Sequence, residues 1–203
     1  GILFLIFIYL GGLYYQFLTV IVAIIAAIEW YLLSSALSKR IKAIGYIYLL
    51  LSAIAFISLR QEVGFLPIFW LGLTVIATDI GGQYGGRFFG RKFFKNGLSK
   101  ISPNKTWEGL ISGIILAGIV GVGFTLFTKA FWWCVIISAI LTIVAQIGDL
   151  LESWAKRKSG IKDSSNILGA HGGILDRIDG HIAVNLIIGI IYFIFGWKWI
   201  IPF

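Results

Sequence analysis

The side chains best able to do chemistry are concentrated in one region of this chain. Seven of its nine carboxylates lie between Asp79 and Asp179. Within that region, the stretch 153–179 mixes serine, lysine, arginine, aspartate and histidine with glycines beside long apolar runs. Carboxylates bind divalent cations, whereas arginine and lysine neutralise phosphate oxygens. The pattern indicates metal-assisted chemistry on a charged, phosphorylated substrate at a membrane surface.

The first acidic group follows a long apolar run. If that run continues as a helix, Asp149, Ser153 and Lys156 stand at i, i+4 and i+7, and Glu152 joins their face at i+3. An acid, a hydroxyl and a cation on one stripe can hold a metal ion and a phosphate together. A solvated helix end with ordinary charge pairs is the alternative interpretation.

The second acidic group is the pair Asp176 and Asp179, spaced i, i+3 just before the last apolar run. If this pair meets Asp149 in space, two or three carboxylates converge. Such a group would suit Mg²⁺, which is usually held by one or two carboxylates together with substrate phosphates and water. The alternative, an acidic cap on the last helix, is plausible for one of the two aspartates.

Between these groups lies His171-Gly172-Gly173, preceded by Lys162-Asp163. Adjacent glycines permit positive φ and can turn backbone N–H groups toward a phosphate. An ordinary turn explains them equally well. Taken alone, His171 is better explained as a hydrogen-bonding loop residue than as a catalytic base.

An earlier segment joins Asp79 and closely spaced glycines to a predicted helix start. The dipeptide Ser102-Pro103 is typical of an N-cap followed by proline at the first helical position. Lys105, Thr106 and Glu108 then fall in the first turns, where the helix dipole favours anions. A lysine is disfavoured there, and an anionic ligand would resolve the conflict. Small-residue packing between helices is the alternative for the glycines.

One further carboxylate, Glu29, lies inside an apolar run. Carboxylates within a membrane span are costly and normally face a partner or a wet cavity. A structural pairing and a role on the substrate side remain equally open.

These side chains must be positioned by membrane helices. The chain is 59% hydrophobic, with mean hydropathy +0.94 and only 13% charged residues, whereas soluble domains are about a quarter charged. Apolar runs near twenty residues recur, and backbone in lipid must be helical to satisfy its polar groups. We predict seven spans: a short one before Gly11-Gly12, then Phe17–Leu37, Ala43–Leu59, Phe65–Ile80, Leu110–Phe127, Phe131–Gly148 and Ile182–Ile201.

The expected fold is therefore an all-α, polytopic membrane bundle that forms a single transmembrane catalytic domain over residues 1–203. Because the chain opens inside an apolar run and contains no methionine, we expect its N-terminus to be truncated. The two segments large enough for chemistry are 81–109 and 149–180. Both lie on the same side of the membrane when the spans alternate.

The charge distribution orients this bundle. The formal net charge is +8, and all but three of the 17 lysines and arginines fall on the side that carries both chemical segments. By the positive-inside rule that side is cytoplasmic. The basic balance thus reflects a lipid bilayer rather than nucleic acid, and the expected location is the inner (cytoplasmic) membrane with the active site facing the cytoplasm.

The chain also resembles the phosphatidate cytidylyltransferase (CDP-diacylglycerol synthase) family. The resemblance covers roughly residues 20–195 and departs from the family at Ala155 and Gln83. It is carried by residues that match the family's C-terminal block and its upstream motifs: Glu29-Trp30, Asp79, Ser102-Pro103, Lys105-Thr106, Glu108-Gly109, Gly148-Asp149-Leu150, Glu152, Ser153, Lys156, Arg157, Lys162, Asp163, His171, Gly172, Gly173, Asp176, Arg177 and Asp179.

The resemblance implies an activity and a set of roles. A phosphatidate oxygen would attack the α-phosphorus of CTP, and pyrophosphate would leave. By resemblance, Asp149 and Asp176 hold Mg²⁺, a monovalent cation such as K⁺ accompanies it, and a homodimer is common. The implied catalytic residues are Ser153, Lys156, Arg157 and Asp179. The implied substrate-binding residues are Asp79, Lys105, Thr106, Glu108, Lys162, Asp163, His171, Gly172, Gly173 and Arg177.

Two rival hypotheses remain. A transporter would also bury carboxylates among glycine-rich helices, but it should show acids near mid-span and internal repeats. A polyprenol or phytol kinase would use CTP with a different acceptor.

Overall fold

The computed structural model describes residues 2–129, 132–167, 169 and 172–196, with side chains from residue 5 onward. Within these residues the chain is all helical. Its elements are α1 (Ile2–Leu10), α2 (Gly12–Leu33), the 3₁₀ turn η1 (Ser34–Ala36), α3 (Lys39–Val63), α4 (Phe65–Phe89), α5 (Trp107–Thr128), α6 (Trp133–Lys158) and α7 (Leu175–Phe195). Six of them, α2 to α7, are long and apolar enough to cross a membrane. The expected polytopic α-helical bundle is confirmed.

The first expected span, the short one before Gly11-Gly12, corresponds to α1. Helix α1 has nine residues, which at 1.5 Å each is about half of the ~30 Å hydrocarbon thickness. Its last carbonyls are bonded by α3 instead: Arg60 Nε donates to Ile8 O at 2.8 Å and Arg60 Nη2 to Tyr9 O at 3.2 Å. Helix α1 therefore packs against the bundle as a short segment.

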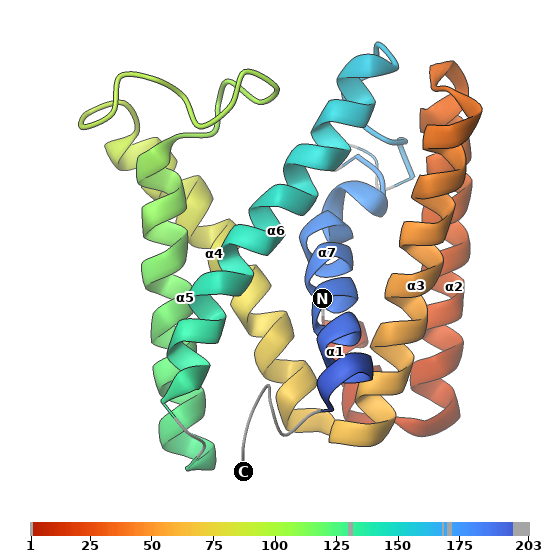
Figure 1. The fold of residues 1–203 in the computed structure, drawn as a ribbon, viewed down its shortest axis with the longest axis vertical. Helices are drawn as coiled ribbons and strands as arrows, with labels where there is room; N and C mark the ends of the chain where they lie inside the picture. The colour runs from red at the N-terminus through yellow and green to blue at the C-terminus, as the bar shows by residue number, and fades with distance from the viewer. Residues whose placement is uncertain (1, 130–131, 168, 170–171, 197–203) are drawn as a thin grey trace.

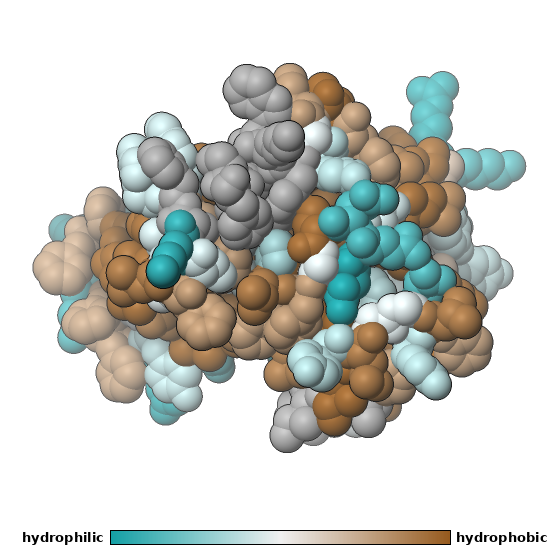
Figure 2. Space-filling model, turned by 90° about the horizontal axis from the view of Figure 1, so that it is seen from below, coloured by the Kyte–Doolittle hydropathy of each residue, from teal (hydrophilic) through white to brown (hydrophobic). Residues whose placement is uncertain are grey.

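The six long helices alternate in direction, so three connections gather at one end of the bundle, which is the upper end in Figure 1. These connections are residues 34–38, 90–106 and 159–174. We call this the basic end, because most of the lysines and arginines lie on or beside these connections. Figure 2 views the opposite end, where hydrophobic residues predominate beside one contiguous group of hydrophilic residues.

Helix α7 lies between α6 on one side and α2 and α3 on the other (Figure 1). Toward the opposite end, a core of residues such as Trp70, Leu71 and Val184 fills the bundle. Toward the basic end, a second core that includes Trp30 and Leu175 joins α2, α3, α6 and α7. The start of α7 is thereby fixed against three other helices.

Helices α4 and α5 pack at short range through glycines. A Cβ added at Gly81 would lie 2.7 Å from the Cα of Gly113, closer than real Cβ atoms approach a neighbour. The packing interpretation of these glycines is therefore correct at Gly81. This close pairing carries α4 to Phe89, nine residues beyond the predicted end of that span.

The predicted start of α5 is wrong. The helix begins at Trp107, and its N-cap is Thr106, whose Oγ1 accepts a hydrogen bond from Gly109 N at 3.1 Å. Ser102 and the following proline form a turn instead, closed by the bond from Lys105 N to Ser102 O at 3.1 Å. Lys105 therefore lies just before the helix.

At the basic end, α6 and α7 also extend beyond the limits of the predicted spans. Helix α6 continues to Lys158, as the stripe from Asp149 to Lys156 requires. Helix α7 begins at Leu175, seven residues before the predicted span, so Asp176 and Asp179 lie within its first turns.

Candidate active site

Two groups of carboxylates occupy the basic end. The anchored cluster contains Glu29, Glu152, Lys156, Ser164 and Asp176. The open cluster contains Asp79, Lys105, Asp149, Arg177 and Asp179. They share helices α6 and α7 but differ in how their charges are satisfied.

Asp176 is the centre of the anchored cluster. Its Oδ2 accepts hydrogen bonds from Ser164 N at 2.9 Å, Ser164 Oγ at 2.9 Å and Gly173 N at 2.8 Å. Its Oδ1 accepts one from Lys156 Nζ at 2.6 Å. Both oxygens are thus engaged within the protein, and they fix the connection 159–174 onto α6 and α7.

Glu29 fixes the same connection from α2. The residue has no exposed surface. Its Oε1 accepts from Ser165 Oγ at 2.6 Å and from Ile174 N at 2.9 Å, and its Oε2 accepts from Leu175 N at 2.6 Å. The first N–H groups of a helix lack intrahelical partners, so Glu29 supplies partners at the start of α7. Of the two roles left open for Glu29, the structural pairing is the one observed.

The glycines of this connection serve the same packing. Gly172 has φ +78°, a conformation that favours glycine. A Cβ at Gly173 would lie 2.6 Å from Glu29 Oε1 and would also overlap Ser164 Oγ. The N–H of Gly173 is directed to Asp176, so this glycine permits close packing and its N–H is already used. His171 lies outside the described residues.

The open cluster is centred on Asp149, whose side chain is 34% exposed. Lys105 Nζ forms an ion pair with Asp149 Oδ2 and donates to Gln146 Oε1 at 3.0 Å. Ser153 Oγ donates to Asp149 Oδ1 at 3.2 Å. The predicted i, i+4 pairing on α6 is therefore present, and the unusual position of Lys105 is explained by its reach across to α6.

Two more carboxylates approach Asp149 from neighbouring helices. Asp79 of α4, which is exposed, interacts electrostatically with Asp149, Lys105 and Arg177. Asp179 of α7 interacts electrostatically with both Asp149 and Asp79. The helices can approach because α6 has a glycine there.

That glycine is Gly148, where an added Cβ would lie 2.8 Å from the carbonyl oxygen of Asp179. The open cluster thus brings three carboxylates from three helices together with two cations.

Glu152 lies at the border of the two clusters and is only 7% exposed. It forms an ion pair with Lys156 at 3.2 Å. The carboxylates of Asp176 and Asp179 also interact electrostatically with Glu152. Neighbouring carboxylates repel one another, and a proton or a further cation would reduce that repulsion.

The carboxylates of the open cluster fit a divalent cation that takes only one or two of its ligands from the protein. Within the described residues, no three histidine, cysteine, aspartate or glutamate side chains are placed to hold a metal ion by themselves. Mg²⁺ does not need such a cage, because it commonly uses one or two carboxylates and completes its shell with substrate phosphates and water. Asp149, partly exposed and beside two further carboxylates, suits that kind of binding.

Two predicted substrate-binding residues, Glu108 and Thr106, shape the connection 90–106. Glu108 is 5% exposed, and its Oε1 accepts from Phe93 N at 3.0 Å and from Phe94 N at 2.9 Å. Thr106 caps α5. These two residues therefore hold the connection that carries Lys105 toward α6.

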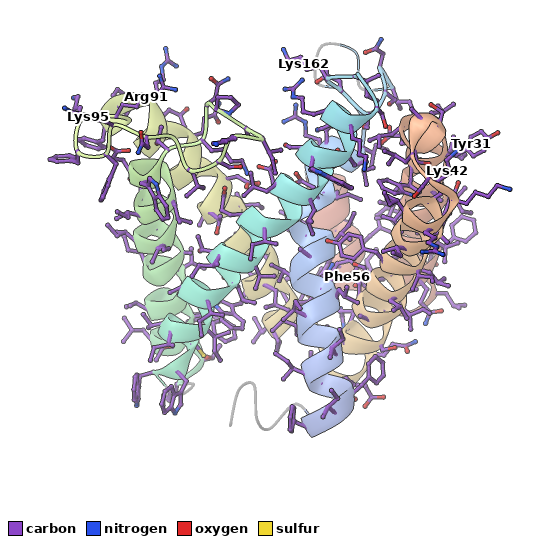
Figure 3. The ribbon with its side chains drawn as sticks, turned by 45° about the horizontal axis from the view of Figure 1, so that its top comes forward. Tyr31, Lys42, Phe56, Arg91, Lys95 and Lys162 are labelled. Carbon is purple, nitrogen blue, oxygen red and sulfur yellow. The ribbon has the colours of Figure 1, made fainter. Side chains whose placement is uncertain are left out.

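The remaining predicted site residues, Arg157, Lys162 and Asp163, are exposed at the basic end. Figure 3 shows Lys162 on the connection after α6, and Arg91 and Lys95 on the connection after α4. Exposed cations on two connections flank the clusters, an arrangement that suits a polyanionic ligand.

Sequence reasoning missed three contributors, Gln146, Ser164 and Ser165. Gln146 lies one turn before Asp149, and the serines directly follow Lys162-Asp163. Their position beside the predicted residues was the only indication of a role.

The comparisons with known proteins identify the family of this chain. The model of the cytidylyltransferase family matches residues 40–195. A phosphatidate cytidylyltransferase of Helicobacter pylori is 39% identical over 147 residues, covering 71% of this chain and 54% of that protein. One of Brucella suis is 40% identical over 145 residues, 70% of this chain and 53% of that protein.

A third relative, the phosphatidate cytidylyltransferase of Staphylococcus saprophyticus, is 39% identical over 151 residues, 73% of this chain and 54% of that protein. The chain spans about half the length of these curated relatives. The matched range, residues 40–195, contains both connections and every member of the open cluster.

Proposed function

This chain belongs to the cytidylyltransferase family, and from that premise we propose that it transfers a cytidylyl group from CTP to phosphatidate, giving CDP-diacylglycerol and pyrophosphate. A phosphate oxygen of phosphatidate forms the new bond to the α-phosphorus of CTP. The bond from that phosphorus to the oxygen that bridges to the β-phosphate breaks, and pyrophosphate leaves with the electron pair. The open cluster, at the end of the bundle where a lipid headgroup and a water-soluble nucleotide can meet, carries the proposal.

Little covalent chemistry falls to the protein in phosphoryl transfer, so its residues act by positioning and charge neutralisation. Lys105 and Arg177 would neutralise phosphate oxygens of a substrate bound beside the carboxylates of the open cluster. Ser153 orients Asp149 through its hydrogen bond. Lys156 and Arg157 extend the positive field along α6 toward the connection 159–174.

We propose Asp149 and Asp176 as magnesium ligands, as the resemblance implies. When bound, the ion would supply positive charge to the phosphate oxygens. Asp149 can serve through its exposed side, whereas Asp176 would have to exchange its bond with Lys156 for one to the metal. A monovalent cation would be attracted by the neighbouring carboxylates of Glu152, Asp176 and Asp179.

We further infer that the basic end faces the cytoplasm at the inner membrane. Lysines and arginines concentrate in cytoplasmic connections of membrane proteins, and CTP would reach the open cluster from that side. Phosphatidate would present its headgroup at the same depth.

The test supplies purified protein in detergent with phosphatidate, radiolabelled CTP and Mg²⁺, and follows labelled lipid and pyrophosphate. Magnesium-dependent CDP-lipid that is lost in Asp149→Asn is the expected result. Glu62→Gln, the same change at an exposed carboxylate of α3 at the opposite end, is the matched control. CDP release in place of pyrophosphate would identify a lipid kinase, and folded protein that forms neither product would overturn the proposal.

A further inference from the structure

An apolar cavity of about 400 Å³ lies among α1, α2, α3, α4 and α7, within the range typical of small-molecule sites. Phe56, which contributes to its wall, lies between α7 and α3 in Figure 3. Most of the cavity wall is hydrocarbon. It runs from Ile174 and Arg177 near the basic end to residues such as Ile8 and Ile68 deeper in the bundle.

Helix α7 contributes a polar stripe to this cavity. Arg177, His181 and Asn185 all line it, and their i, i+4, i+8 spacing places them on one helix face. Asn185 is 8% exposed. In the part of the chain that the structure describes, neither His181 nor Asn185 makes a hydrogen bond through its side chain. Polar groups within a membrane span are costly and usually functional, so these two side chains call for a ligand with hydrogen-bonding groups.

Arg177 connects the cavity wall to the open cluster. This residue lines the cavity wall and also interacts electrostatically with Asp79. With a rise of 1.5 Å per residue, His181 and Asn185 lie about 6 and 12 Å farther along α7. A ligand that fits would carry a negative group beside Arg177, then hydrogen-bond acceptors, and then hydrocarbon.

We propose that this cavity receives the glycerol-ester region and one acyl chain of phosphatidate, with His181 and Asn185 donating to the ester carbonyls. The imidazole N–H and the amide NH₂ can both donate to a carbonyl oxygen. The proposal rests on the function proposed above and adds to it the site that distinguishes a diacyl lipid from other phosphates. An uncharged structural lipid would gain nothing from Arg177 and is the competing occupant.

Gly72 offers a way to fill the cavity without disturbing the helices. It lines the cavity, and an added Cβ there would meet no atom within 4 Å. Gly123 on α5 is equally open but lies outside the cavity. Gly72→Leu and Gly123→Leu are therefore the same change in two helices, and only the first occupies the proposed site.

The first experiment measures retention of phosphatidate by native mass spectrometry, together with the KM values for phosphatidate and CTP. Each displaced methylene weakens lipid binding about fourfold, so Gly72→Leu should raise the phosphatidate KM about tenfold or more. The CTP KM, the thermal midpoint and all values for Gly123→Leu should stay at wild-type levels. Gly72→Ala provides a smaller step if the leucine variant fails to fold. Unchanged phosphatidate binding in folded Gly72→Leu would overturn the proposal.

The second experiment compares diester phosphatidate with its diether analogue, which lacks the carbonyl acceptors. The wild type should prefer the diester about five- to tenfold, and His181→Leu and Asn185→Leu should each reduce that preference. Gln16→Leu, a polar-to-apolar change outside the cavity, should retain it. An equal preference in all four proteins would reject the role of His181 and Asn185. If the wild type binds phosphatidate but makes no CDP-lipid, the reaction fails while the binding comparison still decides the cavity.

Discussion

The anchored and open clusters use the same residue types at the same end of the bundle, yet they meet opposite requirements. In the anchored cluster, Glu29 and Asp176 accept hydrogen bonds at both oxygens, so a new ligand would have to displace one of these bonds. In the open cluster, Asp149 is one-third exposed and has further carboxylates beside it. Saturated carboxylates build a rigid connection, whereas neighbouring carboxylates that repel each other would be stabilised by a bound cation.

This contrast separates two kinds of residue that a sequence motif presents as one. Asp176 and Asp179 are three residues apart on α7, but the first is held by four hydrogen bonds from neighbouring groups and the second faces Asp149 and Asp79. Changes in the anchored cluster should reduce stability first, and changes in the open cluster should reduce activity first.

The largest expected effect is on activity, at Asp149. Asp149→Asn removes the charge at the centre of the open cluster and should lower kcat/KM about a thousandfold, because Asp149 is a proposed Mg²⁺ ligand and the charge of a metal ion on phosphate oxygens contributes several kcal/mol. The thermal midpoint should change little, since the side chain is partly exposed. Steady-state kinetics and thermal unfolding in detergent provide the measurements. A large drop in thermal stability would remove the distinction between the clusters.

The next effect is on stability, at Glu29. Glu29→Gln keeps the shape but replaces one accepting oxygen by an NH₂ group, so buried donors on the connection and at the start of α7 lose their partner. We expect a loss of about 3 kcal/mol, since hydrogen bonds to a charged group contribute about 1.5–3 kcal/mol each. Proteolysis within 159–174 should accelerate. Glu62→Gln serves as control, and wild-type protease resistance in Glu29→Gln would contradict the anchoring role.

A smaller loss of stability is expected at Gly173. The added methyl of Gly173→Ala would lie 2.6 Å from Glu29 Oε1, so the carboxylate or the connection has to move, at about 1–3 kcal/mol. Gly123→Ala meets no atom within 4 Å and should gain up to about 1 kcal/mol from its better helix propensity. Thermal unfolding of the pair isolates the steric effect. Equal midpoints would show that the connection has room to adjust.

The scaffold was predictable because its cause is local. Apolar runs long enough to span a bilayer and the one-sided distribution of lysine and arginine follow from composition, so the six long helices and their basic end could be inferred directly. The continuation of α6 to Lys158 was predictable as well, since Asp149, Ser153 and Lys156 recur with helical spacing.

The errors arise where hydrogen bonds that the sequence pattern does not reveal determine the structure. The start of α5 was placed too early, because a turn closed by Lys105 N and Ser102 O precedes the helix and Thr106 caps it. The role of Glu29 could not be resolved, because its partners lie 135 to 146 residues away. Two of those partners are backbone N–H groups, which leave no trace in a sequence.

The smallest effect compares the two lysines that pair with the clusters. Lys105 pairs with the partly exposed Asp149, whereas Lys156 pairs with Asp176, whose side chain is only 10% exposed. Without Lys105, the carboxylate of Asp149 is still one-third exposed to solvent, and partly solvated ion pairs contribute little to stability, so Lys105→Met should leave the fold intact. It should raise the KM for CTP about tenfold, because the variant lacks a charge that we propose contacts phosphate.

Lys156→Met should instead lower the thermal midpoint, because it leaves Asp176 and Glu152 buried without their cation. Lys105→Arg, which keeps the charge, should restore much of the CTP affinity, and kinetics at several salt concentrations would verify that the contribution is electrostatic. If Lys105→Met proved the less stable of the two methionine variants, the open cluster would also be a structural element, and the division between anchoring and catalysis would have to be drawn elsewhere.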